Sequence, residues 1–277
     1  MIQDIKPKHL DNRYRPYPIT DDAKVLIFRG RDALVSRRED SIVLPDRALF
    51  GSELTDEQYL FSVDDTHYFM ASLREDAPLP EGFMFDNTRS HRLLEPRDAV
   101  YAEMTGWHLY NWYRDNRFCG RCGHKTVHDT KLRMLFCPSC GNQVFPKICP
   151  AIIAAVVDGD RILLTKYAGR SYKNYALVAG FTEIGETAEE TVEREVFEET
   201  GLHVKNIRYF ATQPWGIDAD LLLGYFADLD GDAEIRMDTQ ELSLAGWYRR
   251  GDFDAPTNHA SLTNTMIQAF IDNKMPS

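Results

Sequence analysis

Residues 180–202 read GFTEIGETAEETVEREVFEETGL, and the strongest structural signal in the chain lies there. Thr187 followed three residues later by Glu190 is a capping box, which marks the start of a helix. Gly201 stands where a left-handed residue commonly ends one. The stretch therefore predicts a short helix that begins after Thr187 and ends at Gly201.

The acidic residues of this helix are not placed like those of an ordinary solvated face. Six glutamates share the segment with one arginine, Arg194: Glu189, Glu190, Glu193, Glu195, Glu198 and Glu199. The apolar residues form a stripe at 100° per residue: Ala188, Val192 and Val196. Glu199 falls inside that stripe and Glu195 lies beside it, whereas a solvated acidic face would point the opposite way. A charged surface explains only Glu189, Glu190 and Glu193.

Charge repulsion within the helix indicates a cation. Like charges three or four residues apart destabilise an isolated helix by about 0.2–0.5 kcal/mol per pair. At an effective dielectric near 20 and about 5.5 Å, a partly buried pair would repel by roughly 3 kcal/mol. A divalent cation reverses the sign, because carboxylate oxygens are the hard ligands that Mg²⁺ or Mn²⁺ takes. We therefore interpret Glu195, Glu198 and Glu199 as a metal site.

The same stretch resembles the Nudix box, G-x5-E-x7-R-E-U-x-E-E-x-G-U, where U is a bulky aliphatic residue. All nine specified positions are in register: Gly180, Glu186, Arg194, Glu195, Val196, Glu198, Glu199, Gly201 and Leu202. The resemblance implies an α/β/α sandwich and hydrolysis of a nucleoside diphosphate linked to another group. It implies that Glu195, Glu198 and Glu199 bind catalytic metals. It also implies that Gly180 offers a backbone carbonyl and that Arg194 orients the glutamates through salt bridges.

Composition limits the other function classes. The 277 residues are 43% hydrophobic, and 32 Lys and Arg stand against 43 Asp and Glu, a net charge of −11. This balance argues against loose, charge-driven binding to nucleic acid or an anionic membrane. The first 18 residues lack the apolar core of a signal peptide, and no run approaches 18 apolar residues. We expect no membrane partner and a cytoplasmic location.

The cysteines predict a zinc site. They form two CxxC pairs, each closed by a glycine: Cys119, Cys122, Cys137 and Cys140. This is the zinc-ribbon pattern, in which four thiolates hold one structural Zn²⁺. Two disulfides are the alternative, which a cytoplasmic location disfavours. Cys149 is left over, and we expect a small buried residue there.

The chain divides into four parts by pattern. Residues 1–96 form a β-rich N-terminal domain with short runs of branched and aromatic residues. Residues 97–115 form a linking helix whose Trp107 and Trp112 we expect to pack against a neighbouring domain or a second subunit. Residues 116–143 are the ribbon. Residues 144–277 show strand patterns around the box helix and a closing helix, which gives an α+β chain whose last domain has a mixed sheet between helices.

A zinc ribbon directly before a Nudix domain, after a separate N-terminal domain, resembles the NADH pyrophosphatase branch. That branch carries a motif close to SQPWPFPxS after the box. Here residues 212–220 read TQPWGIDAD, which keeps Gln213, Pro214 and Trp215 and departs at the positions that follow. The departures leave the proposed metal ligands untouched and leave the choice of substrate open.

Further site residues come from the same resemblance. It marks Glu241 as an additional acidic, metal-binding residue of the active site. Phe181 matches an aromatic residue that stacks on a substrate ring, and Phe145 stands where the branch usually has Tyr. Gln213 and Trp215 complete the substrate-binding set. For the aromatic residues, packing in the core is the alternative.

We therefore expect Mg²⁺- or Mn²⁺-dependent hydrolysis of the pyrophosphate in NADH or NAD⁺ to nicotinamide mononucleotide and AMP. Glu198 and Glu241 are both candidates for the general base. The branch also implies removal of NAD caps from the 5′ end of RNA, and a homodimer. Another Nudix substrate, such as ADP-ribose or a dinucleoside polyphosphate, stays open. A rival from another class is a zinc-ribbon nucleic-acid-binding regulator, which predicts a basic groove around the ribbon. The basic residues there are more often a solvated face: Arg114, Arg117, Arg121, Lys125, Lys131 and Arg133.

Overall fold

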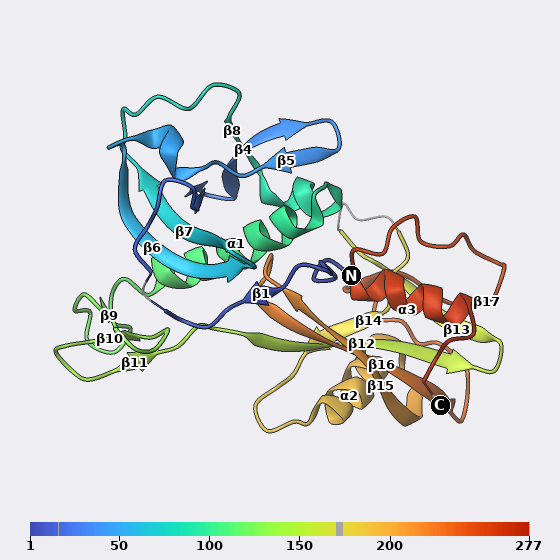
Figure 1. Ribbon diagram of the computed structural model, residues 1–277. Coiled ribbons are helices and arrows are strands. Elements are labelled where there is room, and N and C mark those ends of the chain that lie inside the picture. Colours follow the sequence, from blue (N-terminus) through green and yellow to red (C-terminus); the bar gives the residue numbers. More distant parts are fainter. Residues whose placement is uncertain (16, 170–173, 277) are drawn as a thin grey trace. The chain divides into compact units, whose positions relative to one another are not determined.

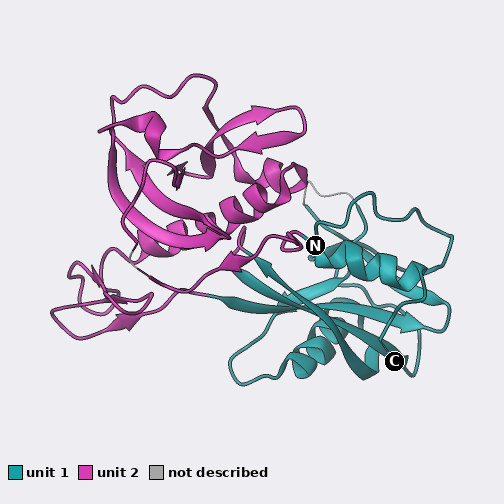
Figure 2. Cartoon of the chain, viewed as in Figure 1, with its two compact units in different colours: residues 1, 148–215, 220–277 teal, residues 2–147, 216–219 magenta. Residues whose placement is uncertain are grey.

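The computed structural model describes residues 1–15, 17–169 and 174–276, which form two compact units (Figure 2). The N-terminal unit comprises residues 2–147 and 216–219. The C-terminal unit comprises residue 1, residues 148–215 and residues 220–277. In the described part of the chain, no helix is both long and apolar enough to cross a bilayer.

The C-terminal unit is built on one mixed sheet (Figure 1). Its strands are β12 (Cys149–Asp158), β13 (Arg161–Tyr167), β14 (Val178–Phe181), β15 (His203–Trp215), β16 (Asp220–Asp230) and β17 (Leu242–Arg249). The order is β15-β16-β12-β13-β17, and β14 pairs with β12. Only β12 and β16 among these pairs run parallel. β12 and β13 form an antiparallel hairpin.

Two helices cover opposite faces of this sheet, α2 (Ala188–Thr200) and α3 (Leu262–Ile271). Alternate residues of β12 face them. Ile153, Ala155 and Val157 share a core with α3, whereas Ile152, Ala154 and Val156 share a second core with α2. This alternation is the period of two that a strand imposes. The unit is therefore the α/β/α sandwich that the sequence predicts.

The N-terminal unit is rich in short strands. They are β1 (Leu10–Asp11), β2 (Lys24–Leu26), β3 (Phe28–Arg29), β4 (Asp32–Arg38), β5 (Ser41–Val43), β6 (Leu54–Val63), β7 (Thr66–Leu73) and β8 (Met84–Asn87). One sheet has the order β1-β6-β7-β2, and the other has β3-β4-β5 with β8 beside β4. The unit also has two 3₁₀ helices: η1 (Arg47–Phe50) joins β5 to β6, and η2 (Thr88–Leu93) follows β8.

Helix α1 (Arg97–Asp115) follows, with Pro96 as its N-cap. Trp107 and Trp112 are 5% and 4% exposed, so one chain alone buries both indoles. The Trp107 Nε1 donates to the carbonyl of Ile217 at 3.4 Å. Part of the aromatic face of α1 is therefore covered by residues 216–219 of the same unit.

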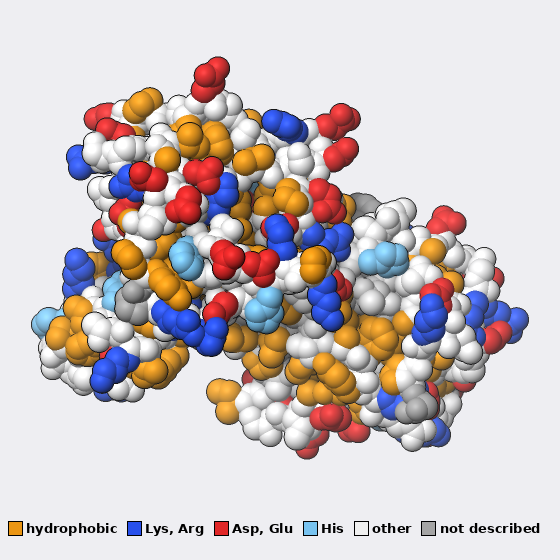
Figure 3. All heavy atoms as spheres, viewed as in Figure 1, with side chains coloured by type: hydrophobic (Ala, Val, Ile, Leu, Met, Phe, Trp, Pro, Cys, Tyr) orange, Lys and Arg blue, Asp and Glu red, His pale blue; other side chains and the backbone are white. Residues whose placement is uncertain are grey.

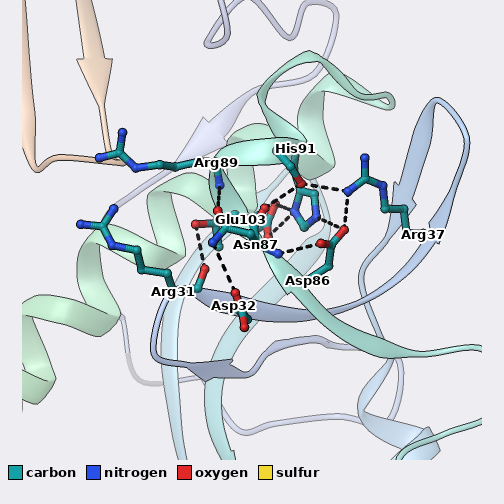
Figure 4. A network of polar contacts seen from close by, with 10 residues as sticks. Arg31, Asp32, Arg37, Asp86, Asn87, Arg89, His91 and Glu103 are labelled. Atoms are coloured by element: carbon teal, nitrogen blue, oxygen red, sulfur yellow. Dashed lines mark hydrogen bonds and ion pairs between the residues drawn. The ribbon is translucent and has the colours of Figure 1, made fainter. Parts of the chain in front are cut away.

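A buried ionic network joins α1 to the strands of the N-terminal unit (Figure 4). His91 and Glu103 are both 0% exposed, and His91 Nδ1 lies 2.8 Å from the Glu103 Oε1. The other ring nitrogen lies 3.1 Å from Asp86 Oδ2, and Asp86 is paired with Arg37. His91 is therefore a buried packing residue of the N-terminal unit.

The ribbon is a small three-stranded sheet of β9 (Val127–His128), β10 (Leu135–Phe136) and β11 (Gln143–Val144). Its two cysteine turns repeat one hydrogen-bond pattern. The amide of Gly123 donates to Cys119, as the amide of Gly141 donates to Cys137. These paired turns aim four sulfurs at one point.

Candidate active site

Helix α2 forms as its local sequence predicts. The Thr187 hydroxyl accepts from the amide of Glu190, and the Glu190 carboxylate accepts from the amide of Thr187. Gly201 closes the helix in the left-handed conformation with φ 71°. Val192 and Val196 are fully buried against the sheet. The orientation of the acidic residues on α2 follows from this buried stripe.

Arg194 is the centre of the acidic cluster. Its guanidinium uses all five N–H donors. Nε and Nη2 each donate a hydrogen bond to the Glu186 carboxylate, at 2.6 and 2.9 Å. Nη1 donates to Glu195 at 2.7 Å and to Glu198 at 3.0 Å, and Nη2 also donates to the carbonyl of Phe181 at 2.9 Å. One cation thus fixes three carboxylates and the end of β14.

Glu195 lies directly against the backbone of β14. A Cβ added at Gly180 would overlap the carboxylate of Glu195. Only glycine lets a carboxylate approach the chain this closely. The Gly180 backbone and the Glu195 oxygens therefore form one compact group of oxygen donors at the end of β14.

The remaining acidic residues differ in exposure. The side chain of Glu198 is 58% exposed, whereas Glu199 is 2% exposed at the buried side of α2. Glu241 is exposed just before β17, and its backbone carbonyl accepts from the amide of Ala168. Its charge acts on Glu195, so the two carboxylates are electrostatic neighbours although 46 residues separate them in sequence.

Their environments shift the pKa values of Glu186 and Glu195 in opposite directions. The paired guanidinium of Arg194 lowers the pKa of Glu186 to about 2, so Glu186 stays ionised. Burial raises the pKa of Glu195, and the hydrogen bond from Arg194 offsets only part of that effect. Carboxyl groups with raised and lowered pKa values around one arginine are typical of functional sites.

A cleft of about 530 Å³ opens beside this cluster. Five of the residues proposed from the sequence line it: Gly180, Phe181, Glu195, Trp215 and Glu241. Phe181 is 55% exposed, so its ring has a free face. Phe145, 54% exposed, follows β11 in the N-terminal unit.

Gln213 is placed differently from a substrate-contacting residue. Its side chain is 0% exposed and does not line the cleft. Its Nε2 donates to the carbonyl of Ala260 at 2.9 Å, and its Oε1 accepts from the amide of Leu262 at 2.7 Å. Ser261, between those two backbone groups, does line the cleft. Gln213 therefore fixes the backbone that shapes one wall.

The four ribbon cysteines form a compact site. Their sulfurs all lie within 4.8 Å of one another, with Cys119 and Cys140 at 3.6 Å and Cys122 and Cys137 at 3.4 Å. These separations exceed a disulfide bond of about 2.05 Å. They approach the edge, roughly 3.8 Å, of a tetrahedron with Zn–S bonds of about 2.3 Å. The structure thus favours the zinc interpretation over the disulfides.

The chemistry of the sulfurs agrees with a metal site. Burial raises the pKa of Cys119, but the amides of Arg121 and Cys122 lower it to about 6, which favours a thiolate at that position. The pKa of Cys122 is raised instead, because the lowering effect of the His124 amide is outweighed by hydrogen bonds with the Cys140 and Cys137 sulfurs. The agreement therefore rests on the geometry of the four sulfurs. Cys149 is partly exposed in β12, not buried as the sequence suggests. Within the described residues, the four cysteines are the one group of three or more potential ligands that converges this tightly.

The comparisons with known proteins agree with both sites. The NUDIX domain matches residues 147–270, and the NADH pyrophosphatase zinc ribbon domain matches residues 114–145. The chain is 38% identical over 185 residues to the NAD-capped RNA hydrolase NudC of Haemophilus influenzae (strain PittGG). That match covers 66% of this chain and 69% of the relative. The chain belongs to the Nudix hydrolase family.

Other relatives carry the same name. The NAD-capped RNA hydrolase NudC of Actinobacillus succinogenes is 44% identical over 160 residues, which cover 55% of this chain and 60% of the relative. That of Mannheimia succiniciproducens is 35% identical over 201 residues, 68% of this chain and 73% of the relative. A solved NUDIX hydrolase from Nitrosomonas europaea is 19% identical with a TM-score of 0.49, and covers 58% of this chain and 95% of its own.

This Nudix chain departs from its branch where residues 216–219 join the N-terminal unit. A Cβ at Gly216 would overlap the carbonyl of Met104 in α1, so the close approach requires glycine. Ile217 is 6% exposed, and Asp218 pairs with Arg89 at 2.5 Å. Gly216, Ile217 and Asp218 therefore serve packing within the N-terminal unit.

The Nudix cleft also contains residues that sequence reasoning missed. They are Tyr167, Glu183, Asp220, Ser261 and Thr263, among others. Asp220 is 9% exposed and stands where the branch motif has Ser. That replacement is the one sequence feature that could have pointed to it as a cleft residue. Ser261 and Thr263 carry no motif, because strand pairing and the position of α3 bring them to the cleft.

Proposed function

We propose that this chain hydrolyses the pyrophosphate bond of NADH or NAD⁺ to nicotinamide mononucleotide and AMP. The observation that carries the proposal is the Arg194 cluster, which holds Glu186 and Glu198 together with Glu195, a residue that lines the cleft. Phe181 and Trp215 line the same cleft and offer apolar surface for a base or nicotinamide ring. The names of the relatives support a substrate that contains NAD.

We propose that Mg²⁺ or Mn²⁺ serves this reaction. The donor set fits such ions, because it consists of carboxylates and a backbone carbonyl and lacks the thiolates and imidazoles of softer metals. The ligands would be Glu195, Glu198, Glu199, Glu241 and the carbonyl of Gly180. Bound there, the cations would neutralise phosphate charge and lower the pKa of the attacking water.

The protein's own groups would prepare the site. Arg194 holds the box glutamates in place, and Glu186 holds Arg194. Glu198 or Glu241 would take the proton from the attacking water, since both are exposed carboxylates. Phe181 and Trp215 would orient the substrate by stacking. Gln213 would act indirectly, through the backbone of residues 260–262.

The same cleft would remove NAD caps from RNA. The capped 5′ end presents the same pyrophosphate bond, and the relatives are named for this activity. Phe145 remains a proposed stacking residue on the grounds of the branch resemblance alone. Its exposure of 54% is compatible with that role.

We propose that the ribbon holds one structural Zn²⁺ per chain, through four thiolates with no open position. A four-thiolate site suits a reducing compartment, which supports the cytoplasm as the place of action. A homodimer follows from the branch resemblance. The buried indoles of Trp107 and Trp112 do not themselves require a second subunit.

The deciding experiment incubates the purified chain with NADH and with Mg²⁺ or Mn²⁺, and identifies the nucleotides formed. The proposal expects AMP and reduced nicotinamide mononucleotide in equal amounts. Parallel reactions with NAD⁺ and ADP-ribose rank the substrates. A much faster rate on ADP-ribose would make ADP-ribose the assigned substrate. If none of the three diphosphates is cleaved, the proposal is wrong. Light scattering of the same preparation measures the oligomeric state.

A further inference from the structure

A second pocket, of about 690 Å³, lies entirely within the N-terminal unit. Its lining comes from Ile27, β3, β6, β7, the end of α1 and the ribbon. It shares no lining residue with the cleft of the C-terminal unit. The proposed hydrolysis does not use it, so its chemistry requires a separate explanation.

Cations dominate the charged residues of this pocket. They are Arg29, Arg114, Arg117 and Lys125, against two carboxylates, Asp56 and Glu57. Glu57 is paired with Arg47, which is outside the lining. In the described part of the chain, the side chains of Arg117 and Lys125 enter no hydrogen bond or ion pair, and both are exposed. The pocket is therefore a positive region on a chain whose net charge is −11.

The structure separates the basic residues of the ribbon neighbourhood into two sets. Arg114, Arg117 and Lys125 line the pocket, whereas Arg121 and Lys131 do not. Arg133 is engaged elsewhere, because it donates to Leu60 and Asn12. The view in Figure 3 shows Lys and Arg side chains beside hydrophobic ones over the ribbon. The positive charge at the pocket is thus a local arrangement and not a uniform coating.

Flat side chains lie next to these cations. Tyr113 and His128 are stacked with ring centroids 5.0 Å apart and 14° between planes. His128 is exposed, so part of its ring surface faces solvent above the buried Tyr113. The Arg114 guanidinium lies 5.5 Å from the centroid of Tyr110. Both pairs line the pocket. Aromatic surface flanked by cations matches a base together with its phosphates.

We infer that this pocket is a second nucleic-acid site, which binds unpaired nucleotides of single-stranded RNA by stacking on His128 and by phosphate contacts to Arg117 and Lys125. A single strand suits the site better than a duplex, because a stacked base must be unpaired. The choice of RNA as the ligand rests on the proposed action on capped RNA. The evidence for a binding pocket comes from its lining residues and does not depend on the proposed hydrolysis.

The test measures RNA binding directly and leaves catalysis aside. The probe is a fluorescein-labelled single-stranded RNA of about 12 nucleotides, a length within the range of common single-strand sites. It carries a 5′-hydroxyl, so it has no pyrophosphate for the cleft. Fluorescence anisotropy with the full-length chain at several salt concentrations gives the dissociation constant and its salt dependence. We expect a Kd between about 10⁻⁶ and 10⁻⁴ M.

The variant R117A/K125A is compared with R121A/K131A, which removes the same charge from ribbon positions outside the pocket. Losing two phosphate contacts should reduce the slope of log K against log salt by about 1.4. That corresponds to roughly 10- to 30-fold weaker binding at 0.1 M salt. His128→Ala should weaken binding by roughly 5-fold or more, the lower range for loss of a stacked base. The control pair should keep most of the salt slope and of the affinity.

The inference is overturned by no binding to the parent chain, by equal losses in both charge pairs, or by equal affinity for duplex RNA. Competition with AMP separates RNA from a free nucleotide. If AMP displaces the probe at concentrations similar to those at which RNA binds, and R117A/K125A loses that effect, the site is a mononucleotide site and the RNA assignment fails.

Turnover of NADH by R117A/K125A should stay at the parental rate. Failure of the parent chain on NADH would count against the proposed function alone.

Discussion

Glu186 holds Arg194 by both carboxylate oxygens, at 2.6 Å to Nε and 2.9 Å to Nη2. Glu186 in turn accepts from the amide of Glu183 and from the hydroxyl of Thr191. Bidentate Arg–carboxylate pairs fix orientation as well as charge. The pair therefore sets the direction of the remaining Arg194 donors, which reach Glu195 and Glu198.

We predict that Glu186→Gln lowers kcat/KM on NADH by about 10- to 100-fold, the usual cost of removing a partner that orients metal ligands. The neutral amide cannot hold Arg194 with both oxygens, so the box glutamates lose their common anchor. Glu193→Gln makes the same charge change on the exposed side of α2 and should keep near-parental turnover. Equal losses in the two variants would show that total charge, and not the anchor, matters.

The close contact between Gly180 and Glu195 gives a second prediction. A Cβ at residue 180 would overlap the Glu195 carboxylate, so Gly180→Ala must displace it. A displacement of about 1 Å can cost on the order of 10²-fold in rate, and we expect a kcat loss of that size. Gly120→Ala, where an added Cβ meets nothing within 4 Å, is the matched control and should leave kcat unchanged. A fully active Gly180→Ala enzyme would remove Glu195 from the proposed site.

Glu198 combines exposure with attachment to Arg194, so it suits both metal binding and proton transfer. We predict that Glu198→Gln lowers kcat on NADH by at least about 10²-fold, the lower range for loss of a general base. Glu189→Gln, in the first turn of the same helix, serves as the control. Near-parental turnover of Glu198→Gln in Mg²⁺ and in Mn²⁺ would contradict the assignment.

Local signals were enough to predict α2 and the zinc ribbon. The capping box, the apolar stripe and the C-terminal glycine of α2 act within a few residues, and the structure contains all three. The ribbon likewise follows from the spacing of its cysteines. In both cases the residues that determine the structure are close together in sequence.

Long-range contacts could not be predicted in the same way. Gln213 belongs to a motif, yet its bonds to residues 260 and 262 depend on how α3 packs against β15. The assignment of residues 216–219 to the N-terminal unit depends on contacts with α1, which precedes them by more than 100 residues. His91 meets Glu103 only because η2 folds against α1. Sequence periodicity contains no information about such pairs.

The ribbon gives a prediction about metal content. Cys137→Ser should lose the bound zinc and lower the thermal midpoint, because zinc contributes on the order of 10 kcal/mol to folding such a segment. Cys149→Ser, a cysteine outside the cluster, should retain one zinc per chain. Elemental analysis by mass spectrometry measures both. A full zinc complement in Cys137→Ser would exclude the four-cysteine site.

The buried pair of His91 and Glu103 predicts how stability depends on pH (Figure 4). Burial lowers the pKa of His91, but hydrogen bonds to Glu103 and Asp86 outweigh it, so the pKa lies above 6.5. Asp86 is itself neutralised by Arg37. Below pH 6.5 the imidazolium stabilises the folded chain fully. As pH rises through the higher folded pKa, that contribution to the free energy of unfolding is lost, with a slope of up to about 1.4 kcal/mol per pH unit.

Urea unfolding followed by tryptophan fluorescence between pH 5.5 and 8.5 should show this decline. His91→Gln should flatten it, while His9→Gln, at an exposed position, should leave it in place. Identical profiles for the parent and His91→Gln would show that another group controls this pH range.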